Sequence, residues 1–244
     1  MKKITRPPKI SEITIDKVEN YQQLYNNKGK IKPRWNYESN KILKEELLKM
    51  TNAECVYCGK KININDFDVE HFLPKSEFPY LSYSYLNLLA SCKICNQNLK
   101  RNKYPKSLDK VRKQLGEEYL VGEIDGIEIV PFEKSNIFNK TKDRLIDPSF
   151  DNPEEHLDFD PITCEYTVKN NSSIGKETNG VFFRENKDYS ESLQLLSSLI
   201  KKMLEEGSSK ELILQNLSTV YGNSYHIEKI YKFWIEMLGE VVSN

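Results

Sequence analysis

The sequence predicts an α+β protein with a small central unit held together by a metal ion bound to four cysteines. Two C-x2-C pairs have 33 residues between them, and that stretch contains too little apolar material for a core of its own. Apolar residues recur at helical spacing before the first pair and again from residue 186 onward. With 244 residues, 38% of them apolar, the chain is long enough to build a sizeable core around that unit.

We expect four segments along the chain. Residues 1–50 form a basic N-terminal arm that ends in a helix, and residues 51–110 hold the cysteine-framed unit. Residues 111–185 form a β-hairpin and loop region, and residues 186–244 form a helical region able to dock a partner. Within the arm we expect a short helix at residues 15–25 and a longer one at 37–50. The second helix has the clearer pattern, with an apolar face made by Ile42, Leu43, Leu47 and Met50.

The region after the cysteine-framed unit predicts short strands. An Asp-Gly pair favours a hairpin over residues 119–131, and a second strand pair is expected over 156–168. Residues 170–180 are rich in Asn, Ser and Gly and predict a loop. Cys164 belongs to no pair, so we interpret it as a small buried residue. His156 lies in a loop and is expected to be structural.

From residue 186 onward the pattern predicts three helices. Ser208 and Glu211 are placed to form a capping box at the start of the second. His226 stands at the start of the third and is expected to face solvent. Such apolar stripes usually form core rather than functional sites. The three stripes consist of Tyr189, Leu193, Leu196, Ile200, Met203 and Leu204; Leu212, Ile213 and Leu217; and Ile227, Ile230, Trp234, Met237, Leu238 and Val241.

Charge is divided unevenly along a chain whose formal net charge is zero. Residues 1–113 carry 23 Lys and Arg against 12 Asp and Glu, and the remaining residues carry 13 against 24. The first part therefore has a net charge of +11 and the second of −11. A basic part and an acidic part on one chain suggest that the first faces phosphate and the second faces something else. Ordinary solvated charge is the alternative explanation.

The composition also limits where the protein works. No stretch is long and apolar enough to span a membrane, and the N-terminus has charges and prolines where a signal peptide needs apolar residues. We therefore expect a cytoplasmic protein without a membrane partner. In that reducing compartment, five cysteines indicate metal ligation or free thiols rather than disulfides.

The two cysteine pairs, Cys55 with Cys58 and Cys92 with Cys95, predict a zinc site. Zn²⁺ favours four thiolates in a tetrahedron, and each C-x2-C turn brings two sulfurs to one ion. A closed four-thiolate site leaves no open coordination position, so this zinc would be structural. Redox dithiols or buried cysteines are the alternatives, and the paired spacing argues against both.

Between the pairs lie residues suited to phosphodiester chemistry. Glu70 and His71, adjacent at the end of a predicted strand, offer an oxygen ligand and a base. Asn96, just after the second pair, offers an amide oxygen at the start of a helix. A carboxylate and an amide oxygen suit Mg²⁺ or Mn²⁺ better than zinc. Lys100 would lie one helical turn beyond Asn96 and could hold a phosphate.

These residues resemble the HNH endonuclease family in its zinc-knuckle form, over residues 55–103. The resemblance implies a ββα-metal core, with His71 as the base that activates water and Asn87 as the residue that orients it. It also implies that Glu70 and Asn96 bind a single catalytic Mg²⁺ or Mn²⁺, and that Lys75, Lys100 and Arg101 contact phosphate. The matching positions are Cys55, Cys58, Glu70, His71, Pro74, Asn87, Leu88, Cys92, Cys95, Asn96 and Lys100.

One position departs from the family pattern. The acidic residue before the histidine is most often Asp, and here it is Glu70. The longer side chain changes the reach to a metal. Asp68 lies two residues earlier on the same strand face and is a candidate second carboxylate, although a structural or surface role is the simpler interpretation.

The flanking segments resemble the HNH subunit of the Septu anti-phage system, of the PtuB type, and retron-associated HNH effectors. This resemblance rests on Trp35, on Leu145-Ile-Asp-Pro148 and on Asn152-Pro-Glu-Glu-His-Leu157. It implies a DNA nuclease in bacterial defence, with an ABC-type ATPase subunit of the PtuA type as its partner. Two alternatives stay open: an RNA nuclease acting on substrates such as tRNA, and a zinc-stabilised nucleic-acid-binding adaptor without catalysis.

Overall fold

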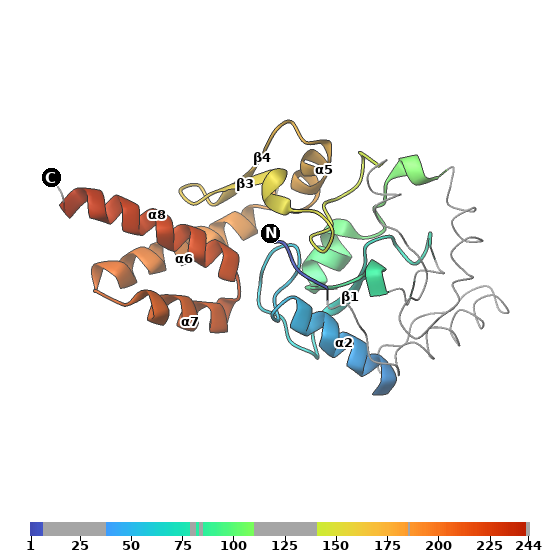
Figure 1. Ribbon diagram of the computed structural model, residues 1–244, viewed down its shortest axis with the longest axis horizontal. Helices are drawn as coiled ribbons and strands as arrows, with labels where there is room; N and C mark the ends of the chain where they lie inside the picture. The colour runs from blue at the N-terminus through green and yellow to red at the C-terminus, as the bar shows by residue number, and fades with distance from the viewer. Residues whose placement is uncertain (7–37, 79–81, 83–84, 110–140, 185, 243–244) are drawn as a thin grey trace.

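The computed structural model describes residues 1–6, 38–78, 82, 85–109, 141–184 and 186–242. Figure 1 shows three stacked helices (α6, α7 and α8) at one end of the molecule and the cysteine-framed unit with α2 and β1 at the other. Helix α5 and the strands β3 and β4 lie between these two ends. None of the helices in the described part of the chain is both long and apolar enough to cross a membrane.

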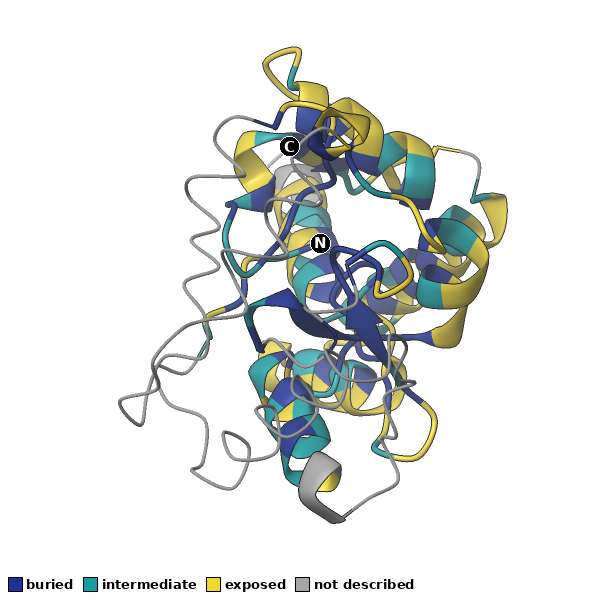
Figure 2. Ribbon diagram, turned by 90° about the vertical axis from the view of Figure 1, so that its right-hand side faces the viewer, coloured by how far each residue is buried: buried dark blue, intermediate teal, exposed yellow. Residues whose placement is uncertain are grey.

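The centre of the cysteine-framed unit is a two-stranded antiparallel hairpin followed by a helix. Strand β1 (Asp68–His71) pairs with β2 (Leu88–Ser91), with Glu70 opposite Leu89. The short helix η2 (Tyr85–Asn87) leads into β2, and the helix η3 (Ile94–Lys100) follows it. Figure 2 shows the hairpin among the most buried parts of the chain. The predicted α+β class and ββα core are confirmed.

Helix α2 (Glu38–Met50) confirms the helix predicted at residues 37–50. It buries Leu43 and Leu47 almost completely and packs against β2. Burying two leucines on one face stabilises the helix more than its own backbone propensity does. The short helix expected at residues 15–25 and the hairpin expected at 119–131 lie outside the described residues.

The strand pair predicted over residues 156–168 is also confirmed. The short helix η4 (Lys106–Leu108) ends the cysteine-framed region, and η5 (Pro153–Glu155) precedes β3 (Leu157–Asp160). Strand β3 pairs with β4 (Glu165–Val168) in an antiparallel hairpin. Cys164 lies just before β4 and is 1% exposed, which confirms its interpretation as a buried residue.

The loop predicted at residues 170–180 is wrong, because most of it forms helix α5 (Ser173–Phe182). Ser172 caps the helix by accepting a hydrogen bond from the Gly175 backbone N–H. Ile174, Thr178 and Phe182 are spaced four residues apart and are all buried. Polar residues conceal this stripe in the sequence, since Thr178 is buried only because its hydroxyl bonds to backbone groups.

The three predicted C-terminal helices are confirmed as α6 (Lys187–Glu205), α7 (Lys210–Tyr221) and α8 (Ser224–Val242). Helix α8 packs against the other two. The predicted cap is one residue out of place: Ser209, not Ser208, accepts the hydrogen bond from the Leu212 N–H. The stripes are buried at their centres, whereas Leu212 and Met237 are exposed.

His226 does not face solvent as expected, because it is 1% exposed. Its Nε2 lies 2.8 Å from the Tyr166 hydroxyl and 3.0 Å from the Tyr189 hydroxyl. Phe159 and Tyr225 add edge-on ring contacts. Burial lowers the pKa of His226 well below its usual value, so the ring is neutral. His226, on α8, therefore links the β3–β4 hairpin to α6 through Tyr166 and Tyr189.

A glycine joins the C-terminal helices to the cysteine-framed unit. Gly222 ends α7 with a φ of 69°, and forms a β-bridge with Lys60. A Cβ atom at Gly222 would lie 2.5 Å from the Lys61 backbone nitrogen and 2.7 Å from the Gly59 carbonyl oxygen. No side chain fits at this position without moving one backbone segment.

We therefore predict that Gly222→Ala destabilises the protein much more than Gly207→Ala. Gly207 also has a positive φ (79°), but nothing lies within 4 Å of its added Cβ. The control substitution should lower the free energy of unfolding by about 1–2 kcal/mol from the left-handed backbone alone. Gly222→Ala should cost at least about 2 kcal/mol more, because of the backbone clash. Urea unfolding measures both, and equal losses would contradict the close approach.

Candidate functional site

The two cysteine pairs come together into one cluster. The sulfurs of Cys55, Cys58, Cys92 and Cys95 all lie within 4.8 Å of one another. Backbone bonds shape the first turn: Gly59 N–H donates to the Cys55 carbonyl, and Cys55 N–H donates to the Lys60 carbonyl. The four-sulfur donor set fits a tetrahedral ion such as Zn²⁺.

Hydrogen bonds among the four sulfurs move the cysteine pKa values in both directions. They lower the pKa of the Cys92 thiol well below its usual value and, together with burial, raise the pKa values of Cys58 and Cys95 well above it. A thiolate is the metal-binding form, and a bound cation would stabilise it at all four positions.

His71 ends strand β1 and is 6% exposed. Its Nε2 lies 2.9 Å from the Ser82 carbonyl oxygen. A carbonyl only accepts hydrogen bonds, so Nε2 carries the proton and Nδ1 is the nitrogen with the lone pair. Burial, helped by the charge of Lys75, lowers the pKa of His71 to about 3. The ring is therefore neutral at physiological pH.

Asn87 holds the turn that follows His71. Its Oδ1 accepts from the Leu73 N–H at 2.8 Å and its Nδ2 donates to the Leu73 carbonyl at 2.9 Å. The Asn87 carbonyl also accepts from the Phe72 N–H at 2.9 Å. Asn87 is completely buried. An amide with two hydrogen bonds to one backbone unit allows little movement of the chain at the end of β1.

Glu70 and Lys100 form a buried ion pair. Lys100 Nζ lies 2.5 Å from Glu70 Oε1, and each side chain is 1% exposed. The Tyr57 hydroxyl lies 3.4 Å from the same oxygen. Lys100 Nζ also donates to the His71 carbonyl at 2.8 Å. Lys100 was expected to contact phosphate, but the structure places its ammonium group in the interior instead.

Asp68 and Asn96 make a second contact between β1 and η3. Asn96 Nδ2 donates to Asp68 Oδ2 at 3.0 Å, and Gln97 Nε2 donates to the same oxygen at 2.8 Å. Both Asp68 and Asn96 are half-buried. The helix η3 is a π-helix, in which the Arg101 N–H donates to the Asn96 carbonyl five residues earlier. Such helices often occur at functional sites.

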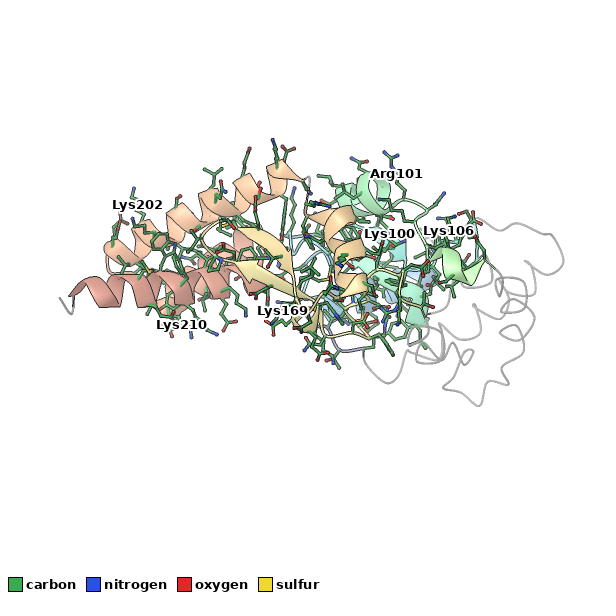
Figure 3. The ribbon with its side chains drawn as sticks, turned by 90° about the horizontal axis from the view of Figure 1, so that it is seen from above. Lys100, Arg101, Lys106, Lys169, Lys202 and Lys210 are labelled. Carbon is green, nitrogen blue, oxygen red and sulfur yellow. The ribbon has the colours of Figure 1, made fainter. Side chains whose placement is uncertain are left out.

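Two of the three expected phosphate-binding cations are exposed. Lys75 follows the turn held by Asn87, and its charge reaches His71. Arg101 follows η3, and Figure 3 shows it projecting from the surface while Lys100 lies further in. Lys75 and Arg101 are therefore available to a ligand approaching β1 and η3.

Oxygen atoms of the kind that bind hard divalent cations lie near η3, on Asp68, Glu70 and Asn96. In the described part of the chain, the four cysteines are the one group of three or more His, Cys, Asp or Glu close enough to share an ion. Asp68 touches Asn96, whereas Glu70 is held by Lys100.

Sequence reasoning missed three contacts of this site: the hydrogen bonds of Gln97, Tyr57 and Ser82. Side chains alternate along a β-strand, so Asp68 and Glu70 lie on one face. This alternation was the sequence signal from which contacts to both carboxylates could have been expected. The backbone carbonyl of Ser82 and the π-helical turn leave no mark on residue types. Ser82 lies between β1 and β2, and the π-helical turn of η3 follows β2, so both contacts depend on how these segments pack.

Comparison with known proteins agrees with this geometry. Residues 55–106 match the family model for HNH endonucleases. The Septu protein PtuB of Bacillus mycoides (strain KBAB4) is 30% identical over 131 residues, or 48% of this chain and 38% of that protein. PtuB of Bacillus thuringiensis is 46% identical over 56 residues, 22% of each chain. These matches confirm the resemblance inferred from the motifs.

A third relative is not a PtuB protein. A Vibrio cholerae protein (serotype O1 biovar El Tor), named for retron Vc95 and the HNH endonucleases, is 35% identical over 72 residues. That match covers 25% of this chain and 35% of the relative. In all three cases the matched region spans well under half of the relative's length.

The cysteine cluster predicts a tightly bound metal ion that depends on Cys92. Cys92→Ser should remove the metal and lower the unfolding temperature, because the cluster joins both ends of the hairpin unit. Cys164→Ala is the matched control: this cysteine is also buried but lies outside the cluster. Elemental analysis and thermal unfolding measure both effects. Full metal content in Cys92→Ser would show that the cluster is not the metal site.

Proposed function

We propose that the protein is a metal-dependent HNH endonuclease that hydrolyses phosphodiester bonds of DNA, and the effector nuclease of a cytoplasmic bacterial anti-phage system. One observation carries this proposal. A neutral, buried His71 stands at the end of β1, on the hairpin that the four cysteines frame, and its Nε2 bonds to the Ser82 carbonyl. An unprotonated imidazole can accept a proton, and a divalent cation bound nearby would lower the pKa of the attacking water.

In this proposal His71 is the general base and Asn87 is its positioning residue. Nδ1 accepts a proton from a water molecule as the water oxygen attacks phosphorus. Ser82 keeps the ring in the tautomer that leaves Nδ1 basic. Asn87 holds the Leu73 backbone, so the end of β1 stays in place during proton transfer.

Two metals complete the proposal. The four cysteines would hold a structural Zn²⁺, and Asn96 with a β1 carboxylate would hold Mg²⁺ or Mn²⁺. When bound, the divalent cation would stabilise the charge that develops on the phosphate and on the leaving 3′ oxygen. The sequence pattern favours Glu70 for that carboxylate, whereas the hydrogen bond between Asn96 and Asp68 favours Asp68.

The substrate class rests on charge and on the relatives. Lys75 and Arg101 are exposed near β1 and η3, and the first 113 residues carry the positive excess. Cations that contact phosphate do not distinguish DNA from RNA. The PtuB relatives support a defence-associated nuclease. DNA is the substrate proposed here, and an RNA such as tRNA is the alternative.

We predict that His71→Ala slows cleavage of plasmid DNA by about 10²–10⁴-fold with Mg²⁺ or Mn²⁺ present. His156→Ala should cleave like the wild type, because His156 bonds to Ser172 away from the site. The assay measures initial rates on plasmid, linear DNA and total tRNA. Cleavage confined to tRNA would move the assignment to RNA. Equal rates for His71→Ala and the wild type would exclude His71 as the base.

We further propose that the partner is an ABC-type ATPase subunit of the PtuA type, docked beside the C-terminal helices. The PtuB relatives support this choice of partner. A cavity of about 660 Å³ lies between α6, the end of α7 and the cysteine cluster. Its lining includes exposed apolar side chains, which are uncommon on a surface without a ligand. These are Ile94, Leu195, Leu199, Val220 and Tyr221.

This docking proposal predicts that Leu195→Glu weakens binding to the co-expressed ATPase by at least about tenfold, because it places a charge in an apolar interface. Leu195 is 74% exposed. Ile162→Glu is the matched control, since Ile162 is 68% exposed but does not line the cavity. Affinity capture with quantified ATPase measures both. Equal retention of the ATPase by the two variants would place the interface elsewhere.

A further inference from the structure

The Glu70 carboxylate is already occupied by a cation from the chain itself. Lys100 reaches it from the last residue of η3 at 2.5 Å, and both side chains are 1% exposed. The Tyr57 hydroxyl approaches the same oxygen. Buried charges are stable only when they are paired, and here each partner neutralises the other.

Lys100 ties this pair to the backbone of His71. The same ammonium group donates to the His71 carbonyl oxygen at 2.8 Å. Glu70 holds the ammonium, and the ammonium holds the peptide unit from which the imidazole projects. The ion pair therefore helps to fix the position of His71.

A divalent cation at Glu70 would meet strong electrostatic opposition. A second positive charge beside the Lys100 ammonium is repelled at close range in a site of low dielectric constant. Displacing the ammonium would leave a lysine at 0% exposure without its counter-ion. Glu70 is thus poorly placed to ligate a metal while Lys100 remains in this position.

Asp68 lies in a different electrostatic setting. It is half-buried, so an ion from solvent can reach it. Its Oδ2 accepts hydrogen bonds from two neutral amides, Asn96 and Gln97, rather than from a cation. Both bonds use Asp68 Oδ2 and the nitrogen end of the amides, so Asp68 Oδ1 and the Asn96 amide oxygen are the hard donors that remain for a cation.

We propose that Asp68, not Glu70, is the carboxylate that binds the divalent cation together with Asn96, and that Glu70 and Lys100 are positioning residues for His71. The inference rests on the proposed nuclease function, which supplies the reason for a divalent cation. It departs from the sequence expectation, in which Glu70 binds the metal and Lys100 binds phosphate.

The first test measures Mn²⁺ binding to the zinc-loaded full chain, from the loss of the free Mn²⁺ signal in electron paramagnetic resonance. Asp68→Asn should weaken Mn²⁺ binding by about tenfold or more, since a lost ligand costs at least as much as a lost outer-sphere partner. Asp66→Asn is the matched control, because it removes the same charge from an exposed residue two positions away.

The Glu70→Gln/Lys100→Met double variant is the decisive comparison. It replaces the ion pair with neutral side chains, so the net charge near η3 is unchanged and no buried charge is left unpaired. It should bind Mn²⁺ with an affinity close to that of the wild type. Loss of Mn²⁺ binding in a folded double variant, or its retention in Asp68→Asn, would overturn the inference.

The positioning role is tested by the ring nitrogens of His71. The chain has three histidines, so comparison with His71→Gln assigns the His71 signals in a ¹H–¹⁵N spectrum. The double variant should shift those signals and leave those of His156 and His226 in place. An unchanged His71 spectrum would reject the positioning role. Neither measurement uses nucleic acid, so its outcome is independent of whether the protein cleaves DNA.

Discussion

The cluster of Cys55, Cys58, Cys92 and Cys95 is the constraint on which the site depends. It joins a turn that precedes β1 to the turn that follows β2, and the first turn also bonds to β2 through Val56 N–H and the Ala90 carbonyl. With both ends held, η3 has to start beside the hairpin, and its side chains reach Asp68 and Glu70. A hairpin this short would otherwise be marginal, because two strands alone bury too little apolar surface.

The sequence predicted this arrangement well where it depends on spacing. The cysteine pairs, the helix ending at Met50, the hairpin at β3 and β4 and the three C-terminal helices all follow from periodicity or from ligand geometry. The predictions that failed depend on tertiary contacts. Helix α5 buries Thr178 through backbone hydrogen bonds, and His226 lies in the core against two tyrosine hydroxyls, where burial keeps its ring neutral. Residue type alone predicts solvent for both.

The candidate site shows the same difference between features that spacing predicts and features that tertiary contacts decide. The sequence pattern singled out His71, Asn87 and Asn96, which the structure places on the hairpin unit and η3, but it treated Glu70 and Lys100 as groups that face ligands. Their burial is decided by η3, whose π-helical turn brings Lys100 under the end of β1. The charge division along the chain does not follow these two units. Residues 51–109 carry 8 Lys and Arg against 6 Asp and Glu, and residues 186–244 carry 6 against 8, so most of the division lies in the other segments of the chain.

The central claim is that His71 activates water for direct hydrolysis of a phosphodiester. The most direct measurement is mass spectrometry of the cleavage products after reaction in ¹⁸O-labelled water. Water attack with departure of the 3′ oxygen predicts one ¹⁸O atom in each new 5′-phosphate and an unlabelled 3′-hydroxyl. Products that end in a 2′,3′-cyclic phosphate, or 5′-phosphates without the label, would contradict the account.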